Sequence, residues 1–546
     1  MAENESSRLL PYQDPRDTFG PDQIEELRRE ENKQIRRDRA RLILWLILAI
    51  ILTSSAIAFT YFFARVSLGK SRNVIMMVSD GFGPASETFA RTYYQYINNM
   101  TEGYMTPLDE ILIGSSRTRS SSSYVSDSAA GATAFACALK TYNNAVGVDQ
   151  NGIPCGTMLT GIVVTTRATD ATPGSFSSHV TSRFQEGEIA KQQIGDYVLG
   201  RQVDLLMGGG RCHFLPNTTD DGCRTDQRDL LQEGLSTYGW KNVMSNRQEF
   251  QALNATDTGI PLPAIGLFSK LDMSFEMDRD KEAQPSLSEM AAAALKSLQL
   301  NAGTNQGFFL LIEGSRIDVA AHSNDPAAHV NEILEYHRTV ELVRAFVAEN
   351  TDTLLISTSD HETGGFTVGF QPDPTVYPEY QWKPEVLTRA KSSTEVLANK
   401  LWGFPSDRID VGRRDKFVRR EILEQGLGIT DPTQEEMHYL IFPKKTVVEL
   451  SLYLGQMLSR RAWLGWTTPG HTGVDVNLYA DGHADGFKSL HGNHENTDIG
   501  EALSAFLKVD LDLITWRLSK DTEKWFHPKA EVSSNLDNYH HQKTGN

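Results

Sequence analysis

Short apolar runs rich in β-branched residues alternate along this chain with stretches of helical periodicity. The apolar runs predict strands, at residues 73–79, 161–166, 203–207, 264–268, 308–312 and 353–357. The periodic stretches predict helices, notably at residues 128–139, 188–199, 286–298 and 327–348. This alternation predicts an α/β fold in which a mostly parallel central sheet carries helices on both faces.

Two long stretches depart from the alternation. Residues 372–464 carry many prolines, aromatic residues and charges, and we expect them to form an insertion or cap. Residues 519–546 are polar, and we expect a poorly ordered or removable tail there. Because no Pro/Gly/Ser-rich linker divides the remainder, we expect residues 70–518 to fold as one large domain.

The most hydrophobic segment, residues 42–63, contains no charged residue and is long enough to cross a bilayer as a helix. A cleaved signal peptide is the alternative, but the polar residues 1–41 precede the segment and no small-residue cleavage site follows it. Basic residues are concentrated before the segment. The positive-inside rule therefore places residues 1–41 in the cytosol and the rest of the chain in a lumen or outside the cell.

Two kinds of residue agree with a luminal body. N-glycosylation sequons begin at Asn99, Asn217 and Asn254. All cysteines follow the predicted span, and their nearness in the chain favours a Cys212–Cys223 disulfide and permits Cys137–Cys155. A buried free thiol remains the alternative for Cys137, which lies in a helical pattern.

The N-terminal tail and the overall charge indicate which macromolecular partners to expect. Glu5, Leu9 and Leu10 resemble an acidic dileucine sorting signal, which predicts a sorting adaptor as a cytosolic partner, although so short a match also arises by chance. The formal net charge is −17 at pH 7, and no basic stripe exists outside the N-terminal segment. A nucleic-acid partner is therefore not expected.

In parallel sheets the chemistry gathers beyond the carboxyl ends of the strands. Asp80 follows the first predicted strand on an Asp-Gly pair, which suits either a metal ligand or an ordinary turn. Ser128 opens an alanine-rich helix. The free N–H groups at a helix start attract an approaching phosphate, although a serine there is also a common helix cap.

The next candidates follow the strand at 161–166. Asp170 and Thr172 offer hard oxygen atoms, which suit Mg²⁺. Arg183 offers a planar fork that matches two phosphate oxygens. Taken singly, each of these residues also fits an ordinary surface position.

The sharpest pattern follows the strand at 308–312. Glu313 comes directly after it, and Asp318 and His322 then stand four residues apart. On a helix this spacing puts both side chains on one face, one turn apart, as a zinc pair requires. A single histidine at this spacing is more often structural, but here it follows a strand end with two acids.

Two further groups complete the set. Asp360 and His361 end the strand at 353–357, and His471 stands in the sequence Pro-Gly-His-Thr-Gly. Nitrogen and oxygen ligands in these numbers, with an oxygen-rich third group, indicate two Zn²⁺ and one Mg²⁺ rather than iron–sulfur or copper.

Together these motifs resemble those of the alkaline phosphatases, over most of residues 70–510. In the family's order they are Asp-Ser-Ala-Ala-Gly-Ala-Thr-Ala (127–134), Asp-Ala-Thr-Pro (170–173), His-Val-Thr-Ser-Arg (179–183), Glu-Gly-x-x-Ile-Asp-x-x-x-His (313–322) and Asp-His-Glu-Thr-Gly-Gly (360–365). The resemblance implies a dimeric enzyme that hydrolyses small phosphomonoesters or phosphopeptides at alkaline pH, with broad specificity and a phosphoserine intermediate. The tail and anchor are similar to those of fungal vacuolar members, which implies a single-pass type II protein of the vacuolar (lysosome-like) membrane.

The resemblance also implies roles, carried over motif by motif. Ser128 is the expected nucleophile, and Arg183 is expected to bind phosphate. The expected ligands are Asp318, His322 and His471 for the first zinc; Asp80, Asp360 and His361 for the second; and Asp80, Thr172, Glu313 and, through water, Asp170 for magnesium.

One departure and two rival functions remain. Bacterial members carry lysine and animal members histidine directly after the zinc-binding aspartate, where this chain has Val319. This difference affects the expected magnesium site and pH optimum.

A two-zinc phosphodiesterase or sulfatase is the nearest rival enzyme, but Thr172 and Glu313 argue for a third metal. A protein that keeps the fold only for binding would have lost a ligand position, and none is missing.

Overall fold

The computed structural model describes residues 20–67, 72–101, 103–158, 161–301, 307–404, 411–442, 445–520 and 522–526. It forms two compact units, residues 1–70 and 71–546. The residues of the sorting-signal prediction, Glu5, Leu9 and Leu10, lie outside the described part.

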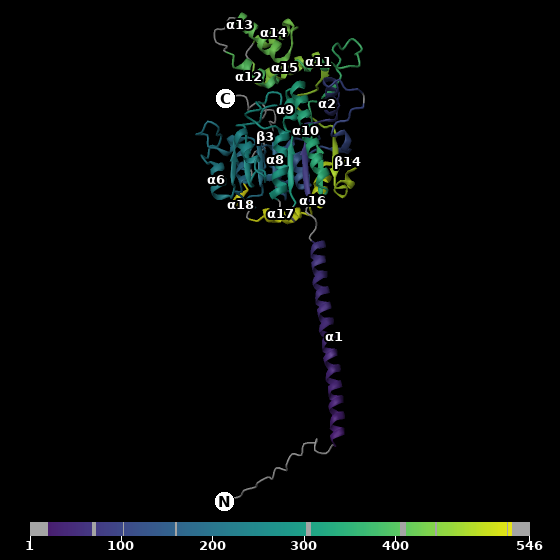
Figure 1. The fold of residues 1–546 in the computed structure, drawn as a ribbon. Coiled ribbons are helices and arrows are strands. Elements are labelled where there is room, and N and C mark those ends of the chain that lie inside the picture. Colours follow the sequence, from purple (N-terminus) through teal and green to yellow (C-terminus); the bar gives the residue numbers. More distant parts are fainter. Residues whose placement is uncertain are drawn as a thin grey trace. The chain divides into compact units, whose positions relative to one another are not determined.

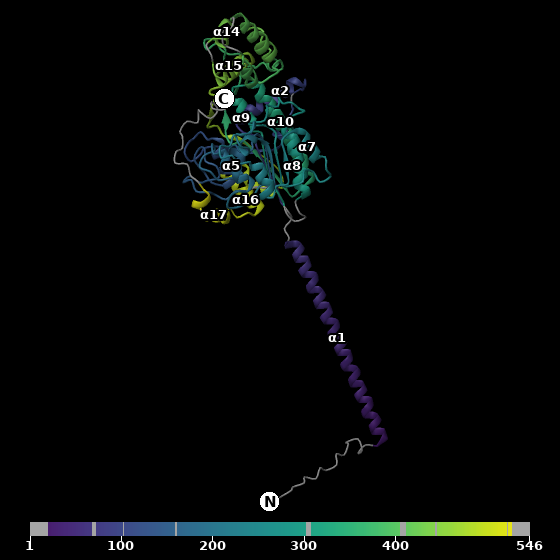
Figure 2. The same ribbon diagram turned by 90° about the vertical axis from the view of Figure 1, so that its left-hand side faces the viewer.

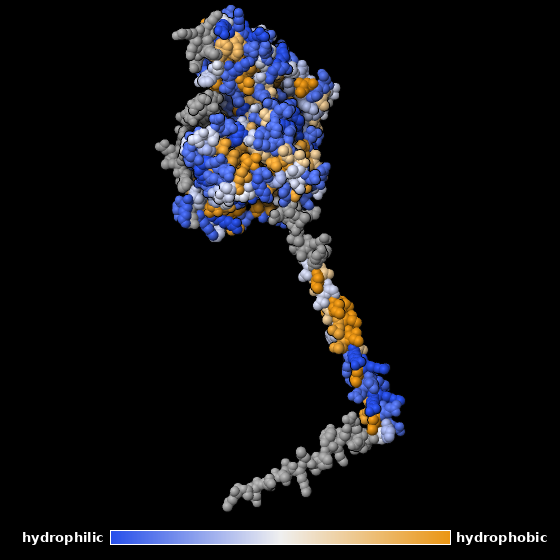
Figure 3. All heavy atoms as spheres, turned by 60° about the vertical axis from the view of Figure 1, so that its left-hand side comes forward, coloured by the Kyte–Doolittle hydropathy of each residue, from blue (hydrophilic) through white to orange (hydrophobic). Residues whose placement is uncertain are grey.

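The described part of the first unit is the helix α1 (Pro21–Ser67), which contains the whole predicted span at 42–63 and also part of the predicted cytosolic tail. Its apolar side chains are exposed, among them Leu42 at 63%, Trp45 at 72% and Ile57 at 69%. Figure 3 shows them as a hydrophobic band next to a hydrophilic N-terminal portion of the helix. Of the described helices, α1 is the one long and apolar enough to cross a membrane.

A ten-stranded sheet in the order β14-β2-β13-β8-β1-β7-β3-β4-β6-β5 forms the centre of the second unit. The run from β8 to β5 is parallel throughout, β14 is parallel to β2, and β13 is antiparallel to both of its neighbours. The strands are β1 (Asn73–Val78), β2 (Leu112–Arg117), β3 (Gly161–Arg167), β4 (Leu205–Gly209), β5 (Asn242–Met244), β6 (Ala264–Leu267), β7 (Phe309–Glu313), β8 (Thr353–Thr358), β13 (Val476–Gly482) and β14 (Gly492–Glu495).

Helices cover both faces of this sheet, as the sequence predicts, because the central strands are apolar on both sides. In β1, Ile75 and Met77 join one core with residues of α8 (Leu287–Asn301) and α10 (Pro326–Glu349). Val74 and Met76 join the other core, with α3 (Ser128–Cys137) and α16 (Asn496–Leu507). Figures 1 and 2 show α8 and α16 on opposite faces of the sheet. The other helices of the body are α2 (Pro84–Ile97), α4 (Ala171–Ser177), α5 (Glu186–Ile194), α6 (Leu230–Thr237), α7 (Arg247–Asn254) and α9 (Arg316–His322).

The predicted insertion at 372–464 is mostly helical. An antiparallel ribbon of β10 (Thr367–Val368) and β11 (Leu464–Gly465) brackets it. Its helices gather beyond one end of the sheet in Figure 1 and include a π-helical segment at Val418–Leu427. They are α11 (Pro384–Leu387), α12 (Thr394–Trp402), α13 (Val411–Phe417), α14 (Gln434–Ile441) and α15 (Val447–Ala462).

The folded body continues beyond the predicted boundary at 518. Helices α17 (Leu511–Leu518) and α18 (Thr522–Trp525) follow α16, and the ring of Phe526 packs with Ala145 and Val148 at 9% exposure. Phe526 buries its ring even though the average composition of this segment predicts a tail. The predicted tail beyond 526 lies outside the described residues.

The cysteines form both disulfides considered from the sequence. Cys137, the last residue of α3, is bonded to Cys155, and Cys212 is bonded to Cys223. Among the described residues there is no free cysteine, so the free-thiol alternative for Cys137 is excluded.

Candidate active site

The candidate residues meet because four neighbouring strands, in the order β8-β1-β7-β3, are parallel and end at the same edge of the sheet. Asp80 follows β1, Glu313 is the last residue of β7, and Asp360 follows β8. The turn after Asp80 needs a glycine, since Gly81 has φ +71° and a Cβ atom there would lie 2.7 Å from Asp318 Oδ1. The sequence placed these acids at strand ends, and the strand order places them together.

Ser128 is the first residue of α3, and Asp127 caps this helix by accepting a hydrogen bond from the Ala130 amide at 3.0 Å. A Cβ atom on Gly131 would lie 2.8 Å from the Asp360 Cβ, so the small residues of α3 let the helix start approach the strand ends closely. As a result Ser128 Oγ lies 3.2 Å from His361 Nε2.

The first expected ligand group is assembled. His322 Nε2 lies 3.1 Å from Asp318 Oδ2 and 3.2 Å from His471 Nε2. The Nδ1 atoms of both histidines bond backbone carbonyls, that of His322 to Pro469 at 2.6 Å and that of His471 to Ser126 at 2.8 Å. These carbonyls fix each ring so that Nε2 faces the other ligands, as in metal sites.

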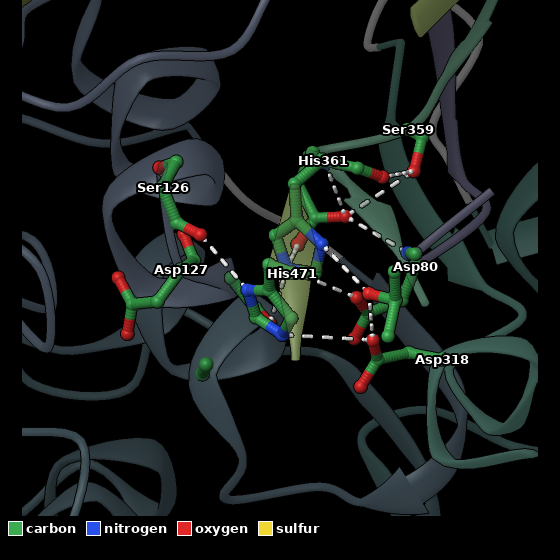
Figure 4. A network of polar contacts seen from close by, with 12 residues as sticks. Asp80, Ser126, Asp127, Asp318, Ser359, His361 and His471 are labelled. Atoms are coloured by element: carbon green, nitrogen blue, oxygen red, sulfur yellow. Dashed lines mark hydrogen bonds and ion pairs between the residues drawn. The ribbon is translucent and has the colours of Figure 1, made fainter. Parts of the chain in front are cut away.

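The second expected group lies beside the first. His361 Nε2 is 3.3 Å from Asp360 Oδ2 and 3.5 Å from Asp80 Oδ1. The His361 and His471 rings stack with their centroids 3.6 Å apart, and Figure 4 shows them facing the carboxylates of Asp80 and Asp318. The possible metal-ligand atoms of Asp80, Asp360 and His361 all lie within 4.8 Å of one another, and so do those of Asp318, His361 and His471. His361 is therefore shared by two close sets of ligands.

Four buried oxygen atoms at the site have no hydrogen-bond partner: Asp80 Oδ1, Asp360 Oδ2, Thr172 Oγ1 and Glu313 Oε2. Buried polar atoms are almost always paired, so this concentration points to cations as the missing partners. Histidine nitrogens with carboxylates suit Zn²⁺, and the oxygen-only set of Thr172 and Glu313 suits Mg²⁺. The residues present therefore fit the metals expected from the sequence.

Burial and neighbouring charged groups shift the pKa values of the acids at the site. Burial, reinforced by the Asp360 and Asp318 carboxylates, raises the pKa of Asp80 well above its usual range. Burial also raises the pKa of Asp360 to about 7 and that of Glu313 to about 8. Asp318 behaves differently: burial works to raise its pKa, but the imidazole of His322 beside it holds the value well below the usual range.

Arg183 lies between two helix-capping acids. Its Nη1 is 3.3 Å from Asp127 Oδ2, and its Nη2 is 3.0 Å from Asp170 Oδ1, so both carboxylates orient the guanidinium. Asp170 caps α4, the helix that carries Thr172. Arg183 is thus held next to the start of α3, where Ser128 lies.

Some residues of the site are missed by sequence reasoning. Thr363 donates a hydrogen bond to Asp318, and fully buried Arg167 bonds Asp170 at 2.8 Å. Arg167 is the last residue of β3, one residue beyond the predicted strand, and stands in no recognisable spacing. Thr363 lies inside the motif at 360–365, but the motif alone assigns it no role. Val319, the departure noted in the sequence, packs against an apolar cluster that contains Phe275.

The alkaline phosphatase family model matches residues 71–509. The chain belongs to the alkaline phosphatase family. It is 44% identical over 539 residues to the repressible alkaline phosphatase of Saccharomyces cerevisiae, a match that covers 93% of this chain and 94% of the relative. It is 47% identical over 486 residues to the alkaline phosphatase of Schizosaccharomyces pombe, covering 86% and 88% of the two chains. Membership confirms the predicted enzyme class, the hydrolysis of phosphomonoesters.

Solved alkaline phosphatases share the fold of the body. The cold-active enzyme of a Shewanella species aligns with a TM-score of 0.65 at 29% identity, over 80% of this chain and 99% of that one. The Thermus thermophilus enzyme aligns with a TM-score of 0.65 at 25% identity, over 83% and 96%. These alkaline phosphatases confirm the predicted α/β class.

The raised pKa values predict a pH dependence of stability in the metal-free enzyme. Asp360, Glu313 and Asp80 keep their protons to higher pH when folded than when unfolded, so the folded state binds more protons between about pH 4 and about pH 8. The free energy of unfolding should therefore fall as pH rises through that window. Urea unfolding of chelator-treated enzyme, beside enzyme supplied with Zn²⁺ and Mg²⁺, measures it. The same slope in both samples would contradict the prediction.

Proposed function

We propose that this alkaline phosphatase hydrolyses phosphomonoesters with two Zn²⁺ and one Mg²⁺, through a phosphoseryl intermediate on Ser128. One observation carries the proposal. Four buried carboxylate and hydroxyl oxygens of the site have no hydrogen-bond partner, and three histidines turn their Nε2 atoms toward its acids or toward one another; one of these, His361 Nε2, lies 3.2 Å from Ser128 Oγ. A binding protein that no longer needed metals would have no reason to keep these atoms unpaired.

The ligand sets follow the two groups in the structure. Zinc would be held by Asp318, His322 and His471 in one site and by Asp80, Asp360 and His361 in the other. Magnesium would be held by Asp80, Thr172 and Glu313, with Asp170 acting through water. When bound, the metals supply positive charge that lowers the pKa of the serine hydroxyl and stabilises the departing oxygen.

The chain's own residues would act in two displacements. The Ser128 Oγ gives its proton to solvent and forms a bond to phosphorus while the bond from phosphorus to the alcohol oxygen breaks, and the alcohol oxygen takes a proton from solvent as it leaves. A water molecule then attacks the phosphoserine from the opposite side and breaks the Oγ–P bond. Inorganic phosphate leaves, and Ser128 regains its proton.

Arg183 and the start of α3 would hold the phosphoryl oxygens through both displacements. The guanidinium is oriented by Asp127 and Asp170, so its fork is fixed before the substrate arrives. The free amides at the first turn of α3 add partial positive charge. Groups that are placed in advance cost no reorganisation when charge shifts in the transition state.

The proposal also includes the location and membrane topology of the protein. The exposed apolar helix α1 and the likeness to the repressible enzyme of S. cerevisiae support a single-pass type II vacuolar protein with a luminal body. Two disulfides support an oxidising compartment. Of the three sequon asparagines, Asn99 and Asn217 are exposed and Asn254 is half-buried, so the first two are the more accessible glycosylation sites. A homodimer and a sorting adaptor on the cytosolic tail complete the proposal.

Hydrolysis of a chromogenic phosphomonoester by the detergent-solubilised chain at alkaline pH tests the metal requirement. Activity should disappear on chelation and return fully only when Zn²⁺ and Mg²⁺ are both restored. Full recovery with one metal alone would contradict the three-metal site. Faster turnover of a phosphodiester than of the monoester would favour the rival enzyme class.

A further inference from the structure

The geometry points to Arg167 as a positioning residue: it fixes the Asp170 carboxylate and, through it, the orientation of Arg183. This inference rests on the proposed phosphate-binding role of Arg183. Arg167 itself is fully buried and makes its contacts with acids rather than with the space beside Ser128.

Arg167 is held by three carboxylates from three segments of the chain. Its Nη2 lies 2.8 Å from Asp170, its Nε lies 2.7 Å from Glu186 at the start of α5, and its Nη1 bonds Asp272, which follows β6. Each nitrogen of the guanidinium therefore faces a different acid. A planar five-donor group can satisfy this arrangement, whereas a lysine ammonium is a single point charge.

The surroundings keep Arg167 in one place. A Cβ atom on Gly210, whose φ is +87°, would lie 2.8 Å from the Cβ of Arg167. The Gly210 backbone therefore packs directly against the Arg167 side chain. On the far side, Asp272 lies 3.7 Å from Arg316, and the Arg316 guanidinium lies 3.6 Å over the Phe275 ring. A buried arginine with fixed neighbours on both sides is a rigid support.

Asp170 connects this support to the site. Its Oδ2 accepts from Arg167, while its Oδ1 accepts from Arg183 at 3.0 Å and from the Ala171 amide at 2.9 Å. The carboxylate plane is therefore set by contacts on both oxygens. Without Arg167, the carboxylate could turn about the Oδ1 contacts, and Arg183 would lose one of the two acids that align its fork. Small displacements of a positioning group are enough to slow a displacement reaction.

The test compares Arg167→Met with wild type, using full-length, metal-loaded enzyme. We expect the inhibition constant of inorganic phosphate to rise about tenfold, the size expected when one charge-assisted contact is lost. Arg279→Met is the matched control, since the Arg279 side chain is only 7% exposed and its Nε lies 2.8 Å from Glu276. It should lower the melting temperature while leaving phosphate inhibition within about twofold of wild type.

A double-mutant cycle separates positioning from general stability. If Arg167 acts through Asp170, Arg167→Met should add less than about twofold to the phosphate inhibition constant of Asp170→Asn. Additive effects, or an unchanged inhibition constant in folded Arg167→Met, would overturn the inference. If Arg167→Met does not fold, Arg167→Lys decides: about a threefold rise supports the inference, and no rise overturns it.

Arg183→Met keeps this inference distinct from the proposed function. If Arg183→Met leaves phosphate inhibition unchanged, the proposed phosphate-binding role of Arg183 fails. If Arg183→Met weakens inhibition strongly while the Arg167 variants do not, the phosphate-binding role stands and the positioning role of Arg167 alone is overturned.

Discussion

Replacement of Ser128 by alanine should lower kcat by about 10⁴-fold or more, because loss of a covalent nucleophile removes the reaction path itself. The hydroxyl opens α3, where the free amides of the helix start favour a phosphate, and it lies 3.2 Å from His361 Nε2. Steady-state hydrolysis and rapid-mixing kinetics of the purified variant measure the loss. No burst of released alcohol should precede turnover.

A serine elsewhere in the same packing provides the control. Ser175 is fully buried on α4 and bonds the Ala129 carbonyl at 3.2 Å. Ser175→Ala should keep kcat within about threefold of wild type, because its hydroxyl serves helix packing. An alcohol burst retained by Ser128→Ala would show that another group is the nucleophile.

Replacement of Asp80 by asparagine should have the second largest effect, since Asp80 is the expected ligand common to zinc and magnesium. Loss of a bound cation removes several kcal/mol of transition-state stabilisation, so kcat/KM should fall about 10³-fold. Elemental analysis of the purified variant should show fewer metal ions per chain than wild type. Asp109→Asn is the control, because Asp109 is paired with Arg91. It should keep the full metal content.

The same substitution should change stability in opposite directions with and without metal. In metal-free enzyme, Asp80→Asn removes a buried acid whose pKa is raised by burial and by Asp360, and it should therefore unfold at a higher temperature than metal-free wild type. In metal-loaded enzyme it should unfold at a lower temperature, because bound metal stabilises the wild-type fold more. The same ranking under both conditions would contradict Asp80 as a shared ligand.

Much of the fold follows from the sequence because the central strands are apolar on both faces. The six predicted strands correspond to β1, β3, β4, β6, β7 and β8, which are the parallel strands around the site. β2 was not predicted, because its residues are largely polar or half-exposed near the sheet edge. β13 is antiparallel to both of its neighbours and lies after the helical insertion, where the alternation has been interrupted.

The candidate site shows the same division between local signals and tertiary contacts. Asp318 and His322 stand out because their spacing has a direct helical meaning, and the structure puts them 3.1 Å apart. Arg167 has no such signal. Its importance comes from carboxylates at 170, 186 and 272, and only the packing of β3, α5 and the segment after β6 brings them together. Contacts of this kind cannot be deduced from spacing.

The most direct test of the central claim is to locate the phosphoryl group during turnover. Metal-loaded enzyme is mixed with excess phosphomonoester, quenched in acid within the first turnovers, digested and analysed by mass spectrometry. The account predicts one additional phosphoryl group on the peptide that contains Ser128, and none in Ser128→Ala. Turnover with no labelled peptide, or with the label on another residue, would contradict the phosphoserine mechanism.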